Sequence, residues 1–300
     1  MILDFDATDD PVHGTQEARF FHGYYDHYCF LPLYVFCGAR LLVAYLRPSN
    51  IDARRHTRPI LKRLVRRLRP AWPNVRIILR GDSGFCRWKR LRWCEQNGVS
   101  YGLGLARNAV LERQAAPFMA AAKTQFQATH EKVRNFHERH YAAGTWDRAR
   151  RAIVKAEHLP AGPNARFVVT NLTTPTPAEL YDTLYTARGD MENRIKEQPL
   201  ALFADRTRCH TFLANQFRVL LSAAAYVLIE TLRRTAWAGT ELEPAPAGTI
   251  RLKLFKVAAR VVTRVRRVIL HFSSAYPLAD LFTRVLARLR APYLLQPAPS

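Results

Sequence analysis

The residues best suited to chemistry are acidic side chains at the ends of predicted strands. Residues 1–7, MILDFDA, alternate between apolar and acidic positions, which is the pattern of a β-strand. Asp4 and Asp6 therefore share one face of this strand, and they either line an edge that faces solvent or belong to a site. Asp6 is the favoured functional acid because it lies at the C-terminal end of the strand, where open α/β sheets bind ligands.

A second acid follows a strand of a different kind. Residues 75–80, VRIILR, are almost continuously apolar, as expected of a strand that is buried on both faces. Asp82 comes directly after this strand, and Gly81 and Gly84 on either side let the backbone turn tightly and let a ligand approach. A carboxylate in such a place is costly unless it is paired or binds a cation.

The third acid lies on a predicted helix that covers residues 176–198. Thr176 suits the N-cap, Pro177 the first helical position, and Glu179 completes a capping box. One face of this helix is apolar, and the other carries Tyr181, Tyr185, Arg188, Glu192 and Lys196. That second face is either a solvated surface with charge pairs one turn apart or a site for an anionic substrate.

The elements that must position these residues follow one another as β-β-β-α-β-α-β, an insertion and further helices. The predicted strands cover residues 1–7, 30–38, 40–47, 75–80 and 99–105, and the predicted helices cover residues 52–69, 86–97, 109–129, 176–198, 205–237 and 278–290. On the helix at 205–237, an apolar side is expected from Phe212, Leu213, Phe217, Leu220, Leu221, Ala224 and Leu228. The last residues are expected to form a frayed tail.

Changes in composition divide the chain into four predicted segments. Residues 1–131 form the first part of a core, residues 132–172 a small β-rich insertion, residues 173–237 the rest of the core, and residues 238–300 a basic C-terminal segment. Trp146 lies in the insertion among arginines, where it can stack on a nucleic-acid base or form the core of the insertion. Residues 251–272 alternate basic and β-branched side chains and predict strands with a cationic face.

The charge of the chain indicates a polyanionic partner. Lys and Arg number 46 against 24 Asp and Glu, a formal net charge of +22, and nucleic acid is the foremost candidate for such a protein. The five scattered cysteines argue against a disulfide framework and a zinc site and favour a reducing cytoplasm. No run of 18 apolar residues occurs, so neither a membrane span nor a membrane partner is predicted.

The order of elements and acids resembles a ribonuclease-H-like fold, a mixed α/β sheet flanked by helices. In that fold the first and fourth strands are neighbours, so Asp6 and Asp82 would lie side by side, and the later helix can bring Glu192 to them. Three carboxylates in one place favour Mg²⁺ or Mn²⁺ over a softer metal.

Several motifs then resemble DDE transposases of the IS4-like superfamily, most closely the IS1380 family, over essentially the whole chain. The matching stretches are DFDATDD from Asp4, RGDSGF from Arg80, RGDMENRIKE from Arg188, DRT from Asp205 and ANQFR from Ala214. The resemblance implies Asp6, Asp82 and Glu192 as catalytic, metal-binding acids that hold two Mg²⁺ or Mn²⁺ ions. It also implies phosphate contacts from Tyr185 and Arg188 and base stacking by Trp146.

The chain departs from the family pattern in two places. The signature lysine falls on Pro199, so Lys196, one turn beyond Glu192, is the expected substitute. The family also carries an N-terminal DNA-binding segment before its first catalytic strand, so a truncated copy or a misplaced start is expected.

The resemblance implies a bacterial insertion-sequence transposase that cleaves double-stranded DNA and transfers strands at transposon ends. Such an enzyme would act as a homodimer in the cytoplasm, associated with the nucleoid. Two alternatives stay open. One is an inactive copy that only binds DNA, and the other is a ribonuclease-H-like repair or junction nuclease.

Overall fold

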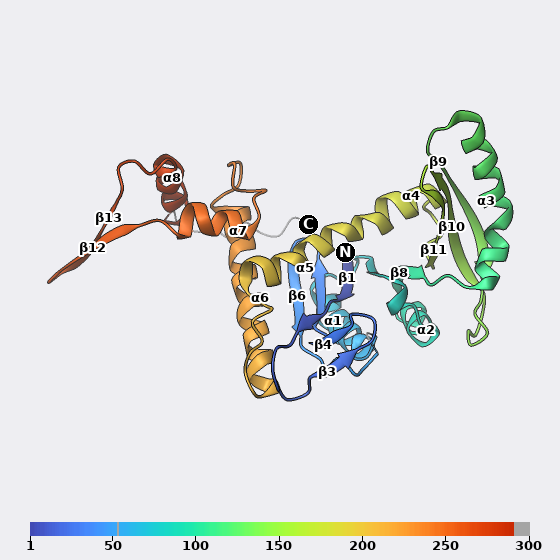
Figure 1. The fold of residues 1–300 in the computed structure, drawn as a ribbon, viewed down its shortest axis with the longest axis horizontal. Helices are drawn as coiled ribbons and strands as arrows, with labels where there is room; N and C mark the ends of the chain where they lie inside the picture. The colour runs from blue at the N-terminus through green and yellow to red at the C-terminus, as the bar shows by residue number, and fades with distance from the viewer. Residues whose placement is uncertain (53, 291–300) are drawn as a thin grey trace. The chain divides into compact units, whose positions relative to one another are not determined.

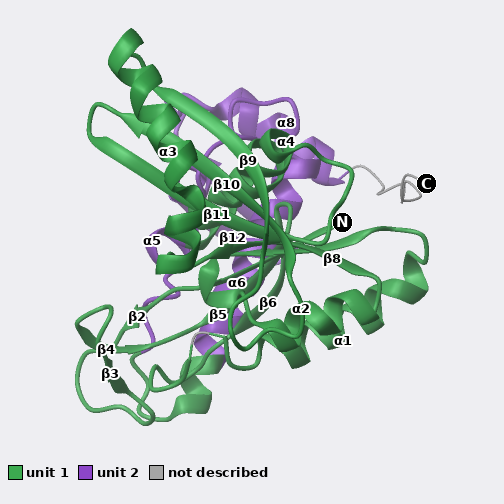
Figure 2. Cartoon of the chain, turned by 90° about the vertical axis from the view of Figure 1, so that its right-hand side faces the viewer, with its two compact units in different colours: residues 1–195, 208–216 green, residues 196–207, 217–300 purple. Residues whose placement is uncertain are grey.

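The computed structural model describes residues 1–52 and 54–290. They form two compact units, one of residues 1–195 and 208–216 and the other of residues 196–207 and 217–300 (Figure 2). The strands predicted as an insertion and the acid-bearing part of the predicted core thus belong to the same unit. The predicted tail, residues 291–300, lies outside the described residues.

The first unit is a mixed α/β structure with one large sheet flanked by helices (Figure 1). Its eight strands lie in the spatial order β6 (Arg40–Tyr45), β5 (Leu33–Cys37), β1 (Ile2–Ala7), β7 (Ile77–Gly81), β8 (Val99–Leu105), β11 (Gly162–Thr170), β10 (Arg150–Leu159) and β9 (Val133–Tyr141). The pairs β1–β7 and β7–β8 are parallel, and the other pairs are antiparallel. The first and fourth predicted strands, β1 and β7, are neighbours as expected.

Side chains alternate in direction along the central strands, so the two faces of the sheet carry different residues. On one face, Leu3 and Leu79 pack with apolar residues of α1 (Thr57–Ala71) and α2 (Trp88–Gln96), including Leu61 and Leu91. On the other face, Ile78 packs in the cluster that contains Leu180 and Tyr181 of the later helical segment. Because side chains alternate along a strand, Asp4 and Asp6 belong to this second face.

Helix α1 begins five residues later than its charge and hydrophobic pattern predicts. Asp52 does not enter the helix, because its carboxylate accepts a hydrogen bond of 3.0 Å from the backbone N–H of Arg54 and pairs with the Arg54 guanidinium. Such local bonds offer the backbone an alternative to helix formation. Helix α1 therefore starts at Thr57 after His56, whose backbone is left-handed.

The stretch predicted to be rich in β-structure, residues 132–172, contains β9, β10 and β11, which extend the main sheet instead of forming a separate layer. Strand β11 pairs with β8, and β10 pairs along its whole length with both of its neighbours. Helix α3 (Ala109–Thr129) covers this end of the sheet, where Leu111 and Ala115 pack on Val154 and Phe167 (Figure 1). A smaller sheet near the N-terminus consists of β2 (Asp10–Pro11), β4 (His27–Phe30) and β3 (Phe20–His22).

The predicted helix at 176–198 is a continuous helical segment with a change of winding in its middle. It consists of α4 (Pro177–Glu179), the π-helical η2 (Leu180–Tyr185), the 3₁₀ turn η3 (Thr186–Arg188) and α5 (Gly189–Leu202). The predicted capping box is confirmed, because Thr176 and Glu179 bond each other's backbone N–H groups. π-helical turns occur frequently at functional sites.

The second unit contains helices and one hairpin. Most of α6 (Phe212–Thr235) belongs to it, followed by α7 (Ala247–Ile250), the π-helical η4 (Arg251–Phe255), the hairpin β12 (Ala259–Arg264) and β13 (Arg267–Phe272), and α8 (Ala279–Arg290). The prediction of strands from residue 251 is wrong at its start, because residues 251–255 are helical. Trp237, Leu242, Ile250 and Leu281 form part of its core.

Helix α6 presents its predicted apolar side outward. Leu213, Phe217 and Leu228 are exposed, whereas the polar Asn215 and Ser222 are buried. By length and composition alone, α6 is apolar enough to cross a membrane, and 28% of its most apolar window is buried.

Candidate active site

Asp4 and Asp6 share a sheet face but have different surroundings. The Asp4 side chain is 3% exposed and is held by the Arg80 guanidinium, whose Nη2 lies 2.7 Å from Oδ2 while Nε bonds Oδ1. Two-pronged pairing of this kind uses both oxygens of the carboxylate. Asp4 is therefore committed to a structural ion pair, and Asp6 is the acid of β1 that stays accessible.

Asp6 lies at the end of β1 in an acidic neighbourhood. Its Oδ1 accepts a 2.9 Å bond from the Ala7 N–H, and its Oδ2 lies 3.0 Å from Nη1 of Arg188. Burial raises the pKa of Asp6 to about 6, with the nearby Asp82 and Glu192 carboxylates adding to the rise and Arg188 opposing it. The three acids that are far apart in the sequence are thus close enough in space to interact.

Asp82 follows β7 and begins the 3₁₀ turn η1 (Ser83–Phe85). Its Oδ1 accepts a 2.8 Å bond from the Gly84 N–H, which caps the turn and leaves the second carboxylate oxygen available. The buried Arg90 of α2 donates to the Phe85 carbonyl and ties the turn to that helix. The Asp82 side chain is therefore fixed at the C-terminal edge of the parallel strands, close to Asp6.

Glu192 lies in the first turn of α5 and is joined to Asp6 through one cation. The Arg188 guanidinium bonds Oδ2 of Asp6 with Nη1 and Oε1 of Glu192 with Nη2. Glu192 is 45% exposed in its side chain, compared with 14% for Asp6. Arg188 therefore bridges two of the three acids.

Tyr185 lies beside the same cluster on the π-helical turn. Burial raises the pKa of Tyr185, and the carboxylate of Asp82 adds to the rise while Arg188 opposes it. Its ring also contacts that of Tyr181 at 5.5 Å between centroids.

The structure does not bring Lys196 and Trp146 into this cluster. Lys196 is exposed one turn beyond Glu192 on α5, and it belongs to the second unit. Trp146 lies in the β9–β10 connection, where its ring packs edge-on against Tyr141 at 5.4 Å and under the Arg150 guanidinium at 5.4 Å. These contacts correspond to the interpretation of Trp146 as a core residue.

Three residues of this region have roles that the sequence patterns did not predict. Arg80 pairs with Asp4 and also donates to the Leu184 carbonyl, so it joins β1, β7 and the π-helical turn. Gly102 and Gly104 of β8 leave room for Leu184 and Tyr185, since a Cβ on Gly104 would lie 2.6 Å from the Tyr185 hydroxyl. The YGLGL sequence of β8, with two glycines inside an apolar strand, is the signal that could have indicated this close approach.

The donor chemistry of the cluster fits a hard divalent cation. Asp6, Asp82 and Glu192 supply only carboxylate oxygens, which suit Mg²⁺ or Mn²⁺, and their mutual repulsion is one cause of the raised pKa of Asp6. Among the described residues, no three His, Cys, Asp or Glu side chains are grouped closely enough to hold a metal as they stand. Arg188 instead supplies the positive charge between Asp6 and Glu192.

The chain matches one protein-family model and is similar to a solved transposase structure. The family model described as transposase DDE domain group 1 matches residues 1–293. No curated protein matches. Among solved structures, the chain is similar to the piggyBac transposase in a cryo-EM structure of its synaptic complex with hairpin DNA, with 8% identity and a TM-score of 0.49. The match covers 98% of this chain and 55% of the piggyBac chain, so this chain spans about half of that protein's length.

Proposed function

The chain belongs to the family of group 1 transposase DDE domains, and from that premise we propose that it cleaves DNA phosphodiester bonds and transfers strands at transposon ends. The observation that supports the proposal is that Arg188 pairs with both Asp6 and Glu192, while the Asp82 and Glu192 carboxylates lie near enough to Asp6 to raise its pKa. A ribonuclease-H-like core is the proposed fold family, because the strand that bears Asp6 lies directly beside the strand that precedes Asp82.

The proposed roles rest on the chemistry of these side chains and on the resemblance to DDE transposases. Asp6, Asp82 and Glu192 would hold two Mg²⁺ or Mn²⁺ ions, which, when bound, activate the attacking oxygen and stabilise the leaving oxygen. Arg188, which already sits between two acids, and Tyr185 would contact the phosphate and offset the charge that develops on it. Lys196 is proposed to contact phosphate from the next turn of α5.

More specifically, we propose that the chain is an IS1380-family transposase of a bacterial insertion sequence. Its proposed partners are double-stranded DNA, as transposon end and as target, and a second copy of the chain in the DNA complex. Its proposed location is the bacterial cytoplasm, associated with the nucleoid. The motifs from Asp4, Arg80 and Arg188 support this assignment.

Nicking of a supercoiled plasmid that carries the element's terminal repeats tests the proposal. Asp82→Asn and Glu192→Gln should each lower Mg²⁺-dependent nicking at least about 100-fold, because each removes a ligand charge that the reaction requires. Asp190→Asn is the matched control, since Asp190 is an exposed acid in the same turn of α5 as Glu192. Binding of Mn²⁺ without DNA, followed by electron paramagnetic resonance, should weaken in the first two variants and not in the control.

The choice of DNA separates this function from its rivals. A transposase should cut the terminal-repeat plasmid in preference to a random duplex or a four-way junction. A repair or junction nuclease should cut the random duplex or the four-way junction at least as well as the terminal-repeat plasmid. Full nicking by Asp82→Asn or Glu192→Gln would refute the assignment of the acids.

A further inference from the structure

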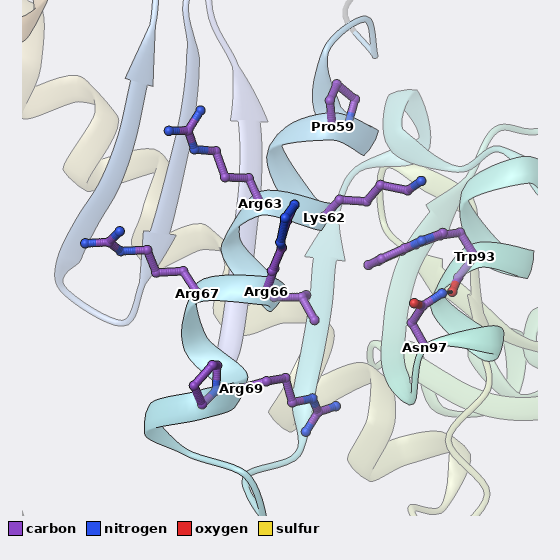
Figure 3. A pocket seen from close by; sticks show the side chains of 10 residues that line it. Pro59, Lys62, Arg63, Arg66, Arg67, Arg69, Trp93 and Asn97 are labelled. Carbon is purple, nitrogen blue, oxygen red and sulfur yellow. Dashed lines mark hydrogen bonds between the residues drawn. The ribbon is translucent and has the colours of Figure 1, made fainter.

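A basic groove lies between helices α1 and α2, on the first unit. The groove has a volume of about 1020 Å³ and is lined by Lys62, Arg66, Trp93 and Asn97 together with neighbouring residues of α1. Figure 3 shows Lys62 pointing from α1 toward the Trp93 ring of α2, and the ammonium nitrogen lies 5.9 Å from the ring centroid. The groove therefore has one cationic wall and one partly aromatic wall.

The cations of the groove are not neutralised by the protein. Lys62, Arg63, Arg66 and Arg67 are exposed, and none of them forms an ion pair with an acid among the residues that the structure describes. Arg69 differs, because its guanidinium donates to the Val75 and Gly98 carbonyls at 2.9 and 2.7 Å and so has a structural role. Four like charges within two helical turns repel one another unless an anion lies beside them.

The extent of the charged surface indicates a polymeric anion. Residues 62–67 span roughly 7.5 Å along the helix axis, at about 1.5 Å per residue. Figure 3 also shows Arg63 and Arg67 pointing to the opposite side of α1 from Lys62. A single phosphate can bind only part of this surface, whereas a DNA strand offers a phosphate about every 3.4 Å of its axis.

The groove and the acid cluster lie on opposite faces of the sheet. Helices α1 and α2 pack on the face that carries Leu3 and Leu79, and Asp6 belongs to the other face, together with the helical segment that bears Glu192. The thickness of the sheet and a layer of helices separates them. A phosphate bound in the groove therefore belongs to a different stretch of DNA from the phosphate at the acids.

We infer that the α1–α2 groove is a second DNA-binding surface, which holds the backbone of a duplex segment away from the reacting phosphate. This inference rests on the proposed function for the identity of its polyanion. It adds a site that positions DNA through phosphate contacts and contributes affinity without reading sequence.

Binding of a fluorescent 30-base-pair random duplex at several salt concentrations tests the inference. The double variant Lys62→Gln/Arg66→Gln should lower the slope of log K against log salt by about 2, since each lost phosphate contact contributes roughly 0.9. At 0.1 M salt this corresponds to a loss of affinity on the order of 50-fold. Glutamine keeps the helix propensity of both positions, so the variant should fold.

The matched control is Arg113→Gln/Lys123→Gln, which removes the same two charges from the exposed surface of α3. It should change the slope by less than 0.5 and the affinity by less than threefold. Equal slopes for the two double variants would overturn the inference. If Lys62→Gln/Arg66→Gln lost as much affinity for single-stranded DNA of the same length as for the duplex, the groove would not be a site for duplex DNA.

The same experiment separates this inference from the proposed function. Nicking by Asp82→Asn tests the proposed function alone, whereas the salt dependence of binding by Lys62→Gln/Arg66→Gln tests the groove alone. If the wild-type protein cut no DNA while Lys62→Gln/Arg66→Gln still bound duplex with a slope lowered by about 2, the proposed function would fail and the inference about the groove would stand.

Discussion

At the scale of single residues, substitution by Asn is expected to reduce the stability of the protein at Asp4 and its nicking activity at Asp6. Asp4→Asn leaves the buried Arg80 guanidinium without its counter-charge, which should cost about 3–5 kcal/mol of unfolding free energy. Asp6→Asn removes a carboxylate whose charged form the fold already disfavours, and Arg188 keeps Glu192 as a partner. We therefore expect Asp6→Asn to change stability by less than about 1 kcal/mol and to abolish nicking.

Urea unfolding of the two variants at pH 7, beside the plasmid nicking assay, measures both effects. An Asp4→Asn protein as stable as wild type would contradict the structural role of Asp4. An Asp6→Asn protein with normal nicking would remove Asp6 from the proposed acid set.

Gly104 is a second residue whose effect on the site acts through geometry alone. A Cβ at this position would lie 2.6 Å from the Tyr185 hydroxyl and 2.9 Å from the backbone nitrogen of Ser83, the residue after Asp82. The tyrosine can rotate away, but the backbone after Asp82 has to shift. Gly104→Ala should therefore lower nicking by roughly 10-fold to 100-fold, with a stability cost of about 1–3 kcal/mol.

Gly144→Ala is the control for this substitution, because no atom lies within 4 Å of the Cβ it would add. The two variants are compared by nicking rate and by urea unfolding. Unchanged nicking by Gly104→Ala would show that the Asp82 turn does not depend on the close approach of β8.

At the scale of elements, the bounds of a helix or strand are predicted best where one hydrophobic period runs through the whole segment. Strand β8 and helix α3 begin and end at the predicted residues 99–105 and 109–129. The helix at 176–198 is less regular than its period suggests, because Arg80 binds the Leu184 carbonyl and Gly102 admits the Leu184 side chain. Those contacts come from strands about 80 to 100 residues earlier in the chain, so no local pattern contains them.

Strand β10 contains an ion-pair network that should make the stability of the sheet depend on pH. Burial alone would raise the pKa of Glu157, but hydrogen bonds from Lys155, Asn164 and Lys132 outweigh it and lower the pKa to about 2. A carboxyl group whose folded pKa is lowered stabilises the fold above its unfolded pKa of about 4.5 and loses that contribution as the pH falls toward 2. The wild-type protein should therefore lose stability across this range.

Thermal or urea unfolding between pH 7 and pH 2.5 measures this loss. Glu157→Gln should be less stable than wild type at pH 7, and the difference should shrink as the pH approaches 2. Glu131→Gln, a substitution of an exposed acid, should follow the wild-type curve throughout. A pH dependence identical in Glu157→Gln and wild type would refute the role of the network.

At the scale of the whole molecule, the proximity of Asp6 and Asp82 could be predicted from the sequence, whereas the burial of the surfaces could not. The resemblance to a ribonuclease-H-like fold predicts that the strands before Asp6 and Asp82 are neighbours, and β1 and β7 do pair. Helix α6 shows the limit. Its apolar stripe predicts a buried side, yet Phe217 and Leu228 are exposed while Asn215 bonds Gln16 and Cys209 inside the first unit. A helical period identifies two faces, but tertiary partners decide which face is covered.

The free energy of local opening should be much lower in the C-terminal hairpin than in the main sheet. Strand β10 is hydrogen-bonded on both edges and carries the buried Ile153 and Val154. In the described part of the chain, β12 and β13 pair only with each other, and Val261 and Val268 are exposed. Isolated two-stranded hairpins are marginally stable in water, whereas central strands open only near the global free energy of unfolding.

Hydrogen–deuterium exchange followed by mass spectrometry measures this difference. Peptides from residues 259–272 should exchange at least about 100-fold faster than peptides from residues 150–159, because a gap of roughly 3 kcal/mol in opening free energy corresponds to that ratio. Helix α3, which packs on β10 through Leu111, serves as an internal reference for slow exchange. Slow exchange at the hairpin in the free protein would contradict this prediction, because pairing between two exposed strands alone does not give such protection.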